Sequence, residues 1–348
     1  MKTPHIAIVG LAFIIIMVLI NTFTLSQPLS METSAKTPLT SVTGVLVPLY
    51  AGPGPIWDSV VQTKLAHPLV PMVIIINPSN GPGSTINPSY VTGVQKLQSA
   101  GIVVIGYVFT SYGSKNSTDI KTEIDTYKSW YGVTGIFFDE MAYVPGFENY
   151  YSSLSQYAKS QGLKLTVGNP GQDTIPSYIG TVDNIVLHDD PGVPLLSDLQ
   201  GWHTAYPKSN FSFISFGLSF LDQAFLNNAT NYVGYEYMTD DNLPDPFDTL
   251  PSYFDTLVGD LDNFPPAVAT SQLINTINGM NLPQAVGDSL DAKLESVISS
   301  LNSGNNNTAK NQLNAFVMEV NAQIGKKLLA DQASQLVDQA RDIINKIS

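Results

Sequence analysis

Short apolar runs recur along the chain between residues 44 and 238. Most of them are continuous rather than alternating, which is typical of strands that are buried on both faces of a parallel sheet. The predicted strands are Gly44–Tyr50, Met72–Asn77, Ile102–Val108, Gly135–Asp139, Leu163–Gly168, Asn184–His188, Phe211–Gly217 and Tyr232–Met238. Five of the intervals between them read as helices: Trp57–Ala66, Tyr90–Ala100, Asp119–Tyr131, Glu148–Gln161 and Ser219–Asn227.

Eight strands that alternate with helices over about 220 residues favour an α/β fold, a (β/α)8 TIM-type barrel. The alternative is a doubly wound open sheet. That fold is disfavoured because the first strand is followed by Gly52-Pro53-Gly54-Pro55, in which the prolines prevent a row of amide donors for a phosphate.

The hydrophobic pattern changes after Phe264-Pro265-Pro266. Apolar residues then recur at three- and four-residue spacing, as in Val286, Leu290 and Leu294, which predicts four amphipathic helices in a small all-α bundle. We therefore divide the chain into four parts: a signal peptide or signal anchor at 1–25, a linker at 26–41, the barrel at 42–264 and the helical bundle at 265–348.

The N-terminus resembles a targeting segment. Lys2 precedes the apolar run Ile6–Ile20, and a Ser-, Thr- and Pro-rich linker follows, as in secretory signals. A cleaved signal and a retained helix that anchors the protein in a membrane are both open. Either one predicts an extracellular or cell-surface protein.

Charge and composition exclude several classes of function. The chain has a net charge of −13, no cysteine and four histidines, and its only arginine is Arg341. A nucleic-acid partner is disfavoured because no basic stripe is present. Thiolate metal sites are excluded and a three-histidine site is disfavoured, so we predict neither a metal nor a cofactor. Residues 40–264 hold 8 Lys against 21 Asp and Glu, so the excess acid belongs to the predicted barrel.

Polar residues gather where the predicted strands end, which is the side of a (β/α)8 barrel that carries the chemistry. These candidate ligand-binding residues are Tyr50, Asn77, Tyr107, Tyr112, Asn169, His188, Glu236, Tyr237 and Asp240. Carboxylates, amides, hydroxyls and tyrosines without a cation suit a neutral or cationic polyhydroxylated ligand. We therefore predict a polysaccharide partner.

Asp139 and Glu140 are the sharpest candidates for catalysis because they follow the apolar run Ile136-Phe137-Phe138. An acid that is partly desolvated beside another acid has a raised pKa, as a general acid requires. Asp189, at the end of the sixth strand, is the preferred partner. Asp190 and Glu236 are the other options for the partner, unless Glu236 is a core-facing or outward-facing polar residue.

The predicted barrel resembles the spherulation-specific family 4 over about residues 43–255. The likeness is carried by motifs in a fixed order: Val47-Pro48-Leu49-Tyr50, Ile76-Asn77-Pro78, Gly106-Tyr107-Val108, Gly135-Ile136-Phe137-Phe138-Asp139-Glu140, Thr166-Val167-Gly168-Asn169-Pro170-Gly171 and Thr239-Asp240-Asp241. The resemblance implies a (β/α)8 barrel related to fungal hydrolases that cut galactosaminogalactan, an α-1,4-linked polysaccharide containing galactosamine.

The same resemblance implies that Asp139 and Glu140 are functional acids. It also implies a Glu near the end of the sixth strand, where this chain has Asp189. Two hypotheses follow: an exported glycoside hydrolase acting on an amino-sugar polysaccharide, or a non-catalytic surface protein that binds glycan.

The C-terminal part resembles the FIMAH module of exported prokaryotic proteins. The likeness rests on Leu301-Asn302-Ser303-Gly304-Asn305 and on Gln312-Leu313-Asn314-Ala315-Phe316-Val317. It implies an accessory domain with a cell-surface partner, and a purely stabilising bundle is the alternative.

Overall fold

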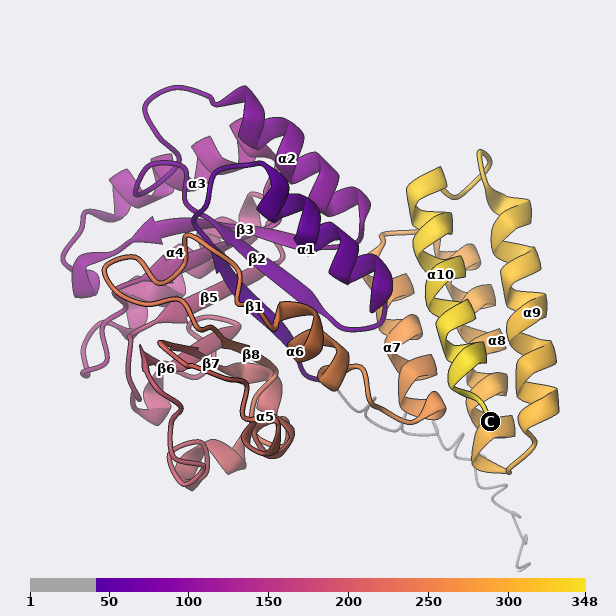
Figure 1. Ribbon diagram of the computed structural model, residues 1–348. Coiled ribbons are helices and arrows are strands. Elements are labelled where there is room, and N and C mark those ends of the chain that lie inside the picture. Colours follow the sequence, from indigo (N-terminus) through magenta and orange to yellow (C-terminus); the bar gives the residue numbers. More distant parts are fainter. Residues whose placement is uncertain (1–41) are drawn as a thin grey trace, which may run out of the picture. The chain divides into compact units, whose positions relative to one another are not determined.

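The computed structural model describes residues 42–348, and its first part is a closed barrel of eight parallel strands (Figure 1). Each strand pairs with the next along the chain, and β8 closes on β1. The strands are β1 (Gly44–Leu49), β2 (Met72–Ile76), β3 (Val103–Phe109), β4 (Gly135–Asp139), β5 (Leu165–Asn169), β6 (Asn184–Pro191), β7 (Phe211–Phe216) and β8 (Tyr235–Met238). This arrangement confirms the predicted barrel and excludes an open, doubly wound sheet.

Helices follow most of the strands and cover the outside of the barrel (Figure 1). They are α1 (Pro55–Ala66), α2 (Pro88–Ser99), α3 (Ser117–Tyr131), α4 (Glu148–Ser160), α5 (Gln223–Ala229) and α6 (Phe254–Leu261). After β6 the chain forms short 3-10 turns, Gly201–Ala205 and Lys208–Asn210, in place of a long helix.

Close packing of helix on strand explains one glycine in the barrel wall. A Cβ at Gly106 of β3 would lie 2.5 Å from the ring of Tyr127 in α3. Without that atom the ring rests on the strand, and the Tyr127 hydroxyl donates to the carbonyl of Ile76 in β2. Gly106 thus lets α3 pack closely against β3, and the next residue, Tyr107, points toward the open end of the barrel where the strands end. We call this end the mouth.

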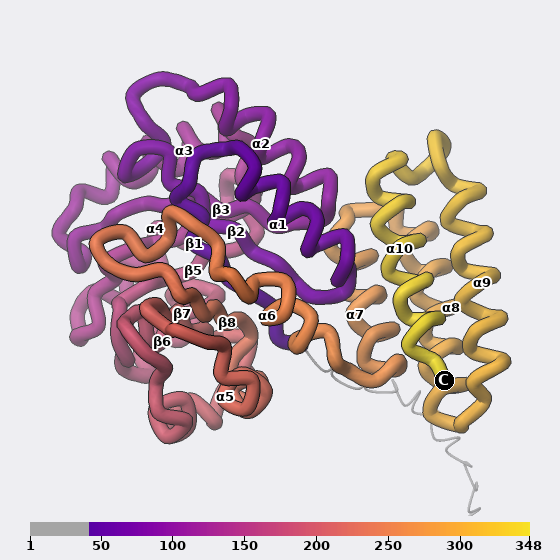
Figure 2. Tube along the Cα trace, in the orientation of Figure 1, coloured from indigo at the N-terminus to yellow at the C-terminus, as the bar shows by residue number. Residues whose placement is uncertain are grey.

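Four further helices follow the barrel, as predicted (Figure 2). They are α7 (Pro266–Gly279), α8 (Gln284–Asn302), α9 (Asn306–Gln323) and α10 (Ala330–Lys346). Their buried apolar residues, among them Leu290, Leu313 and Phe316, form a core separate from that of the barrel. The relation to the FIMAH module stays a prediction.

The predicted signal segment and linker lie outside the described residues. Across residues 42–348, no helix has the length and apolar character needed to span a bilayer.

Candidate active site

Three neighbouring strands bring an amide and two acids together at the mouth of the barrel. Asp139 is the last residue of β4 and pairs in register with Asn169, the last residue of β5. Asp189 lies on β6, just after a register shift that begins at Val186. Such an irregularity re-aims the side chains that follow it.

A single amide group holds the two carboxyl groups. Asn169 Nδ2 donates to Asp139 Oδ1 at 2.9 Å and to Asp189 Oδ2 at 2.7 Å. Its Oδ1 accepts from the backbone N–H of Gly171 at 3.0 Å, which fixes the orientation of the amide. Because both oxygens bond to one nitrogen, they lie less than about 6 Å apart.

Tyrosines form the inner wall beside Asp139. The Tyr107 hydroxyl donates to Asp139 Oδ2 at 2.7 Å, so both oxygens of this carboxylate are bonded. Tyr50 packs edge-on against the Tyr107 ring at 5.8 Å and against Phe247 at 5.6 Å. Two of the four tyrosines predicted for ligand binding, Tyr50 and Tyr107, therefore lie with the acids.

Glu140 sits in a strained backbone conformation, with a φ of 48°. Facing residues hold it there, since its carbonyl accepts from the Tyr112 N–H at 2.7 Å and from Thr110 Oγ1 at 2.8 Å. Left-handed backbone at a non-glycine residue costs about 1–3 kcal/mol and is concentrated at functional sites. With this φ, the backbone at Glu140 departs from the extended conformation of β4, which ends at Asp139.

The environment shifts the pKa values of all three acids upward. Burial raises the pKa of Asp189 to about 7, with a further contribution from the charge of Asp139, although the Asn169 hydrogen bond opposes the shift. Burial also raises the pKa of Asp139, against the hydrogen bonds from Tyr107 and Asn169. The pKa of Glu140 is raised by burial and by Asp139. Near neutral pH, Asp189 is thus the acid of this group best placed to hold a proton.

An exposed aromatic pair borders the acids. The rings of Tyr112 and Tyr143 lie 6.3 Å apart, edge to face, and the two residues are 49% and 39% exposed. Tyr143 was not among the predicted residues, although it follows Asp139-Glu140 by only three positions in the β4–α4 loop. Exposed aromatic rings beside polar groups are the surfaces on which sugar rings stack.

Three other predicted ligand-binding residues form hydrogen bonds with nearby loops, and a fourth is buried in the barrel. Asn77 Oδ1 accepts from the Gly81 N–H, and His188 Nε2 donates to the Gly192 carbonyl. Asp240 accepts from the N–H and hydroxyl of Ser252 and so fixes the β8–α6 loop. Tyr237 is fully buried and in register with Ile214, which leaves no ring surface for a ligand.

Glu236 is the second residue of β8, away from the strand ends that carry the other acids. Its side chain faces the helices outside the barrel. It pairs with Val45, the second residue of β1, and with Phe213, whose ring packs against Phe225 of α5. Residues in one register row face the same way, so Glu236 faces the outside of the barrel rather than its interior. It is fully buried, and neither carboxylate oxygen has a hydrogen-bond partner. Glu236 is therefore an outward-facing polar residue, which was the alternative considered from the sequence. We no longer count it among the candidate ligand-binding residues.

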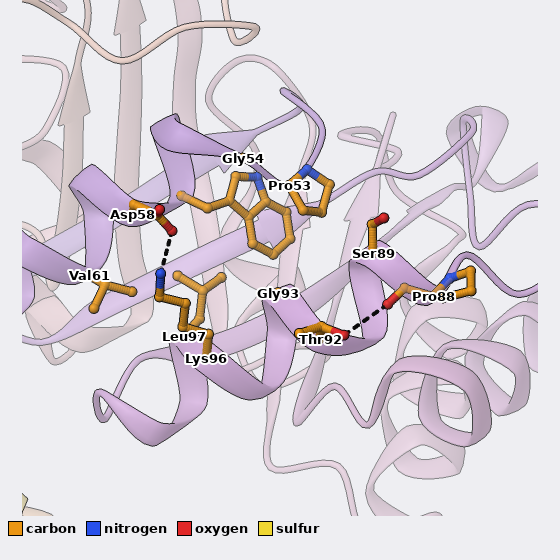
Figure 3. A pocket seen from close by; sticks show the side chains of 11 residues that line it. Pro53, Gly54, Asp58, Val61, Pro88, Ser89, Thr92, Gly93, Lys96 and Leu97 are labelled. Carbon is orange, nitrogen blue, oxygen red and sulfur yellow. Dashed lines mark hydrogen bonds and ion pairs between the residues drawn. The ribbon is translucent and has the colours of Figure 1, made fainter.

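One cleft of the barrel lies on its outer helices, away from the acids of the mouth. A cleft of about 450 Å³ between α1 and α2 is lined by Trp57, Gly93 and the ion pair Asp58–Lys96 (Figure 3). None of the mouth acids lines it. Within residues 42–348 no three or more histidine or carboxylate side chains are grouped so that they could hold a metal ion.

The fold and the site together define a (β/α)8 barrel protein with paired carboxyl groups at the carboxyl ends of its strands. The model of the spherulation-specific family 4 matches residues 44–261, and the chain belongs to this family.

Several known proteins are similar to parts of this chain. Spherulin-4 of Physarum polycephalum is 38% identical over 169 residues, which are 48% of this chain. The chain spans about half the length of that relative, 50%. The crystal structure of Aspergillus clavatus Sph3 in complex with GalNAc superposes with a TM-score of 0.57 at 23% identity, over 65% of this chain and 99% of that one. This likeness shows the shared barrel fold.

Proposed function

We propose that the protein is an exported glycoside hydrolase that cleaves a polysaccharide containing amino sugars of the galactosamine type. The observation that carries this proposal is the Asn169 bridge, which holds the Asp139 and Asp189 carboxyl groups close together at the barrel mouth. Glycosidases use two carboxyl groups about 5–5.5 Å apart when the anomeric configuration is retained and about 6.5–9.5 Å apart when it is inverted. The bridge favours the retaining arrangement.

The environments of the two acids suggest their roles. Asp189, with its pKa near neutrality, protonates the glycosidic oxygen as the bond to the anomeric carbon breaks. Asp139, whose two oxygens each accept a hydrogen bond, attacks that carbon as the carboxylate. The ionised Asp189 then takes a proton from a water molecule as the oxygen of that water bonds to the anomeric carbon. The bond between Asp139 and the sugar breaks, which regenerates the Asp139 carboxylate and the protonated Asp189.

The surroundings favour an amino sugar. Tyr112 and Tyr143 offer exposed rings for stacking, and Glu140 adds a second carboxyl group beside Asp139. An ammonium group on a deacetylated sugar complements such a group electrostatically. The fold relative from Aspergillus clavatus holds GalNAc, a sugar of this class. Export is supported by Lys2 and the apolar run Ile6–Ile20.

Turnover of partly deacetylated α-1,4-galactosamine oligomers tests the proposal. We expect product from the wild type and a loss of turnover of on the order of 10³-fold or more in Asp139→Asn and in Asp189→Asn. Asp58→Asn, on the outer face of α1, is the control that keeps full activity. Equal turnover by Asp139→Asn and wild type would remove Asp139 from the chemistry. Binding of the oligomers without turnover by the wild type would favour the glycan-binding surface protein.

A further inference from the structure

A second cleft lies at the end of the barrel opposite the mouth. Its barrel side includes Val103, Leu165 and Tyr235, the first residues of β3, β5 and β8. Its other side comes from α7 and α10, including Thr276 and Gln335. We call this space the base cleft. Its volume is about 560 Å³, within the range of roughly 300–1,000 Å³ that is usual for small-molecule sites.

The lining of the base cleft differs from that of the mouth because it contains no acid. Five of its side chains are amides, which both donate and accept hydrogen bonds: Gln98, Gln272, Asn275, Gln335 and Gln339. Val103, 38% exposed, and the ring of Tyr235 add apolar surface. This mixture suits a ligand with hydroxyl or amide groups around an apolar face.

The two lysines of the lining are already bonded to backbone carbonyls. Lys64 Nζ donates to the carbonyls of Pro68 and Val70 at 2.9 and 2.8 Å. Lys164 Nζ donates to the carbonyl of Gly279 in α7 at 2.8 Å. Both ammonium groups therefore have backbone partners.

One buried group of the lining lacks a partner. Gln339 of α10 is 2% exposed, and its Nε2 donates to the Pro68 carbonyl at 2.8 Å. Its Oε1 is buried without a hydrogen-bond partner. A buried acceptor left unpaired costs about 1–3 kcal/mol, and Gln339 is one of the residues that line the base cleft.

We propose that the base cleft binds a neutral N-acetylhexosamine segment of the same polysaccharide. This identification of the polymer rests on the proposed function. The acidic mouth attracts the cationic, deacetylated units, whereas the uncharged amides and apolar floor of the base cleft suit acetylated units. Because the two sites lie at opposite ends of the strands, a chain held at the base leaves the mouth open for cleavage.

Calorimetry on the intact protein tests the base cleft. The background variant is Asp139→Asn, which suppresses turnover, and the probe is an N-acetylgalactosamine tetrasaccharide. Thr276→Trp fills the cleft from α7, and Gln335→Ala removes one amide from it. Ser296→Trp adds the same bulk to the exposed face of α8, outside the cleft, and is the matched control.

We expect tetrasaccharide binding that Thr276→Trp abolishes, that Gln335→Ala weakens at least fivefold, and that Ser296→Trp leaves unchanged. Thermal midpoints equal to that of the background show that these variants are folded. Absence of any binding, or equal binding by Thr276→Trp and Ser296→Trp, overturns the base cleft as a glycan site. Turnover of deacetylated oligomers by the otherwise wild-type protein is measured separately. In that assay, Thr276→Trp should leave kcat on short substrates unchanged. The binding measurement therefore tests the base cleft, and the turnover measurement tests the proposed function separately.

Discussion

Asn169 has a neutral side chain, yet it affects the pKa values of two acids, Asp139 and Asp189. Its amide donates to both carboxyl groups and lowers the pKa of each, against the burial that raises them. The sequence indicated a polar residue at the end of β5. It could not indicate the bridge, because the bridge depends on the register of three strands and on the irregularity in β6.

Replacing Asn169 by Ala removes this bridge. We expect the pKa values of Asp139 and Asp189 to rise, because their charged forms lose a donor. Both limbs of the pH–rate profile should then move to higher pH, and kcat at the optimum should fall on the order of 10²-fold. The profile is measured by initial rates against pH. Asn77→Ala, which alters a loop contact at the end of β2, should leave the two limbs in place; a profile unmoved by Asn169→Ala would contradict the bridge.

Glu236 offers a test of stability rather than activity. Burial raises its folded pKa well above the ordinary value, and the charge of Lys208 only partly offsets the shift. The carboxyl is protonated in both states below the unfolded pKa of about 4.3, so its penalty is absent there. As pH rises above that value the unfolded state ionises first, and stability falls with rising pH.

We expect Glu236→Gln, which resembles the protonated acid, to lose less stability than wild type between pH 5 and pH 8. Urea unfolding at the two pH values measures the difference. Activity should persist in this variant because Glu236 lies away from the mouth. Parallel losses in the two proteins would show that Glu236 does not contribute to the pH dependence.

At the scale of elements, continuous apolar runs were enough to predict the eight strands, and β4 has the predicted bounds, Gly135–Asp139. The same runs carry no alternation, so they could not show which residues face inward. Glu236 and Tyr237 follow one another on β8, and their facing was settled only by pairing with β7 and β1. The strand pattern could not point to Tyr143, because this residue lies in the loop between β4 and α4.

Two glycine substitutions should change the free energy of unfolding in opposite directions, because only one of the two glycines is closely packed. Gly106→Ala places a methyl group against the Tyr127 ring, and we expect a loss of about 1–3 kcal/mol in the free energy of unfolding. Gly287→Ala in α8 meets no atom within 4 Å and should stabilise the protein by about 0.5–1 kcal/mol. Denaturant unfolding compares both with wild type. Equal effects of the two changes would contradict the close approach of α3 to β3.

At the scale of the whole molecule, the acidic excess belongs to the barrel, which also carries the acids of the mouth. A negative surface raises the local concentration of a cationic polymer, and salt screens this attraction, with a Debye length of about 10 Å at 0.1 M. Composition alone gave the sign of the charge. The structure places three of the barrel's acids, Asp139, Glu140 and Asp189, at the mouth.

The salt dependence of KM tests this attraction. We expect KM for deacetylated oligomers to rise several-fold between 20 mM and 500 mM NaCl, while KM for fully acetylated oligomers changes little. Initial rates at a fixed pH give both values. A KM for the deacetylated oligomers that is insensitive to salt would mean that the excess charge serves solubility alone.

The residue after Asn169 has a consequence for the lifetime of the protein. Asparagine ages mainly when the backbone nitrogen of the next residue attacks its amide and expels ammonia. Asn169 is followed by Pro170, which has no backbone N–H for that ring closure. The labile pairs Asn80-Gly81 and Asn278-Gly279 lie elsewhere, in a loop and at the end of α7. Deamidation should therefore occur at these two exposed asparagines long before it reaches the amide that joins the two acids.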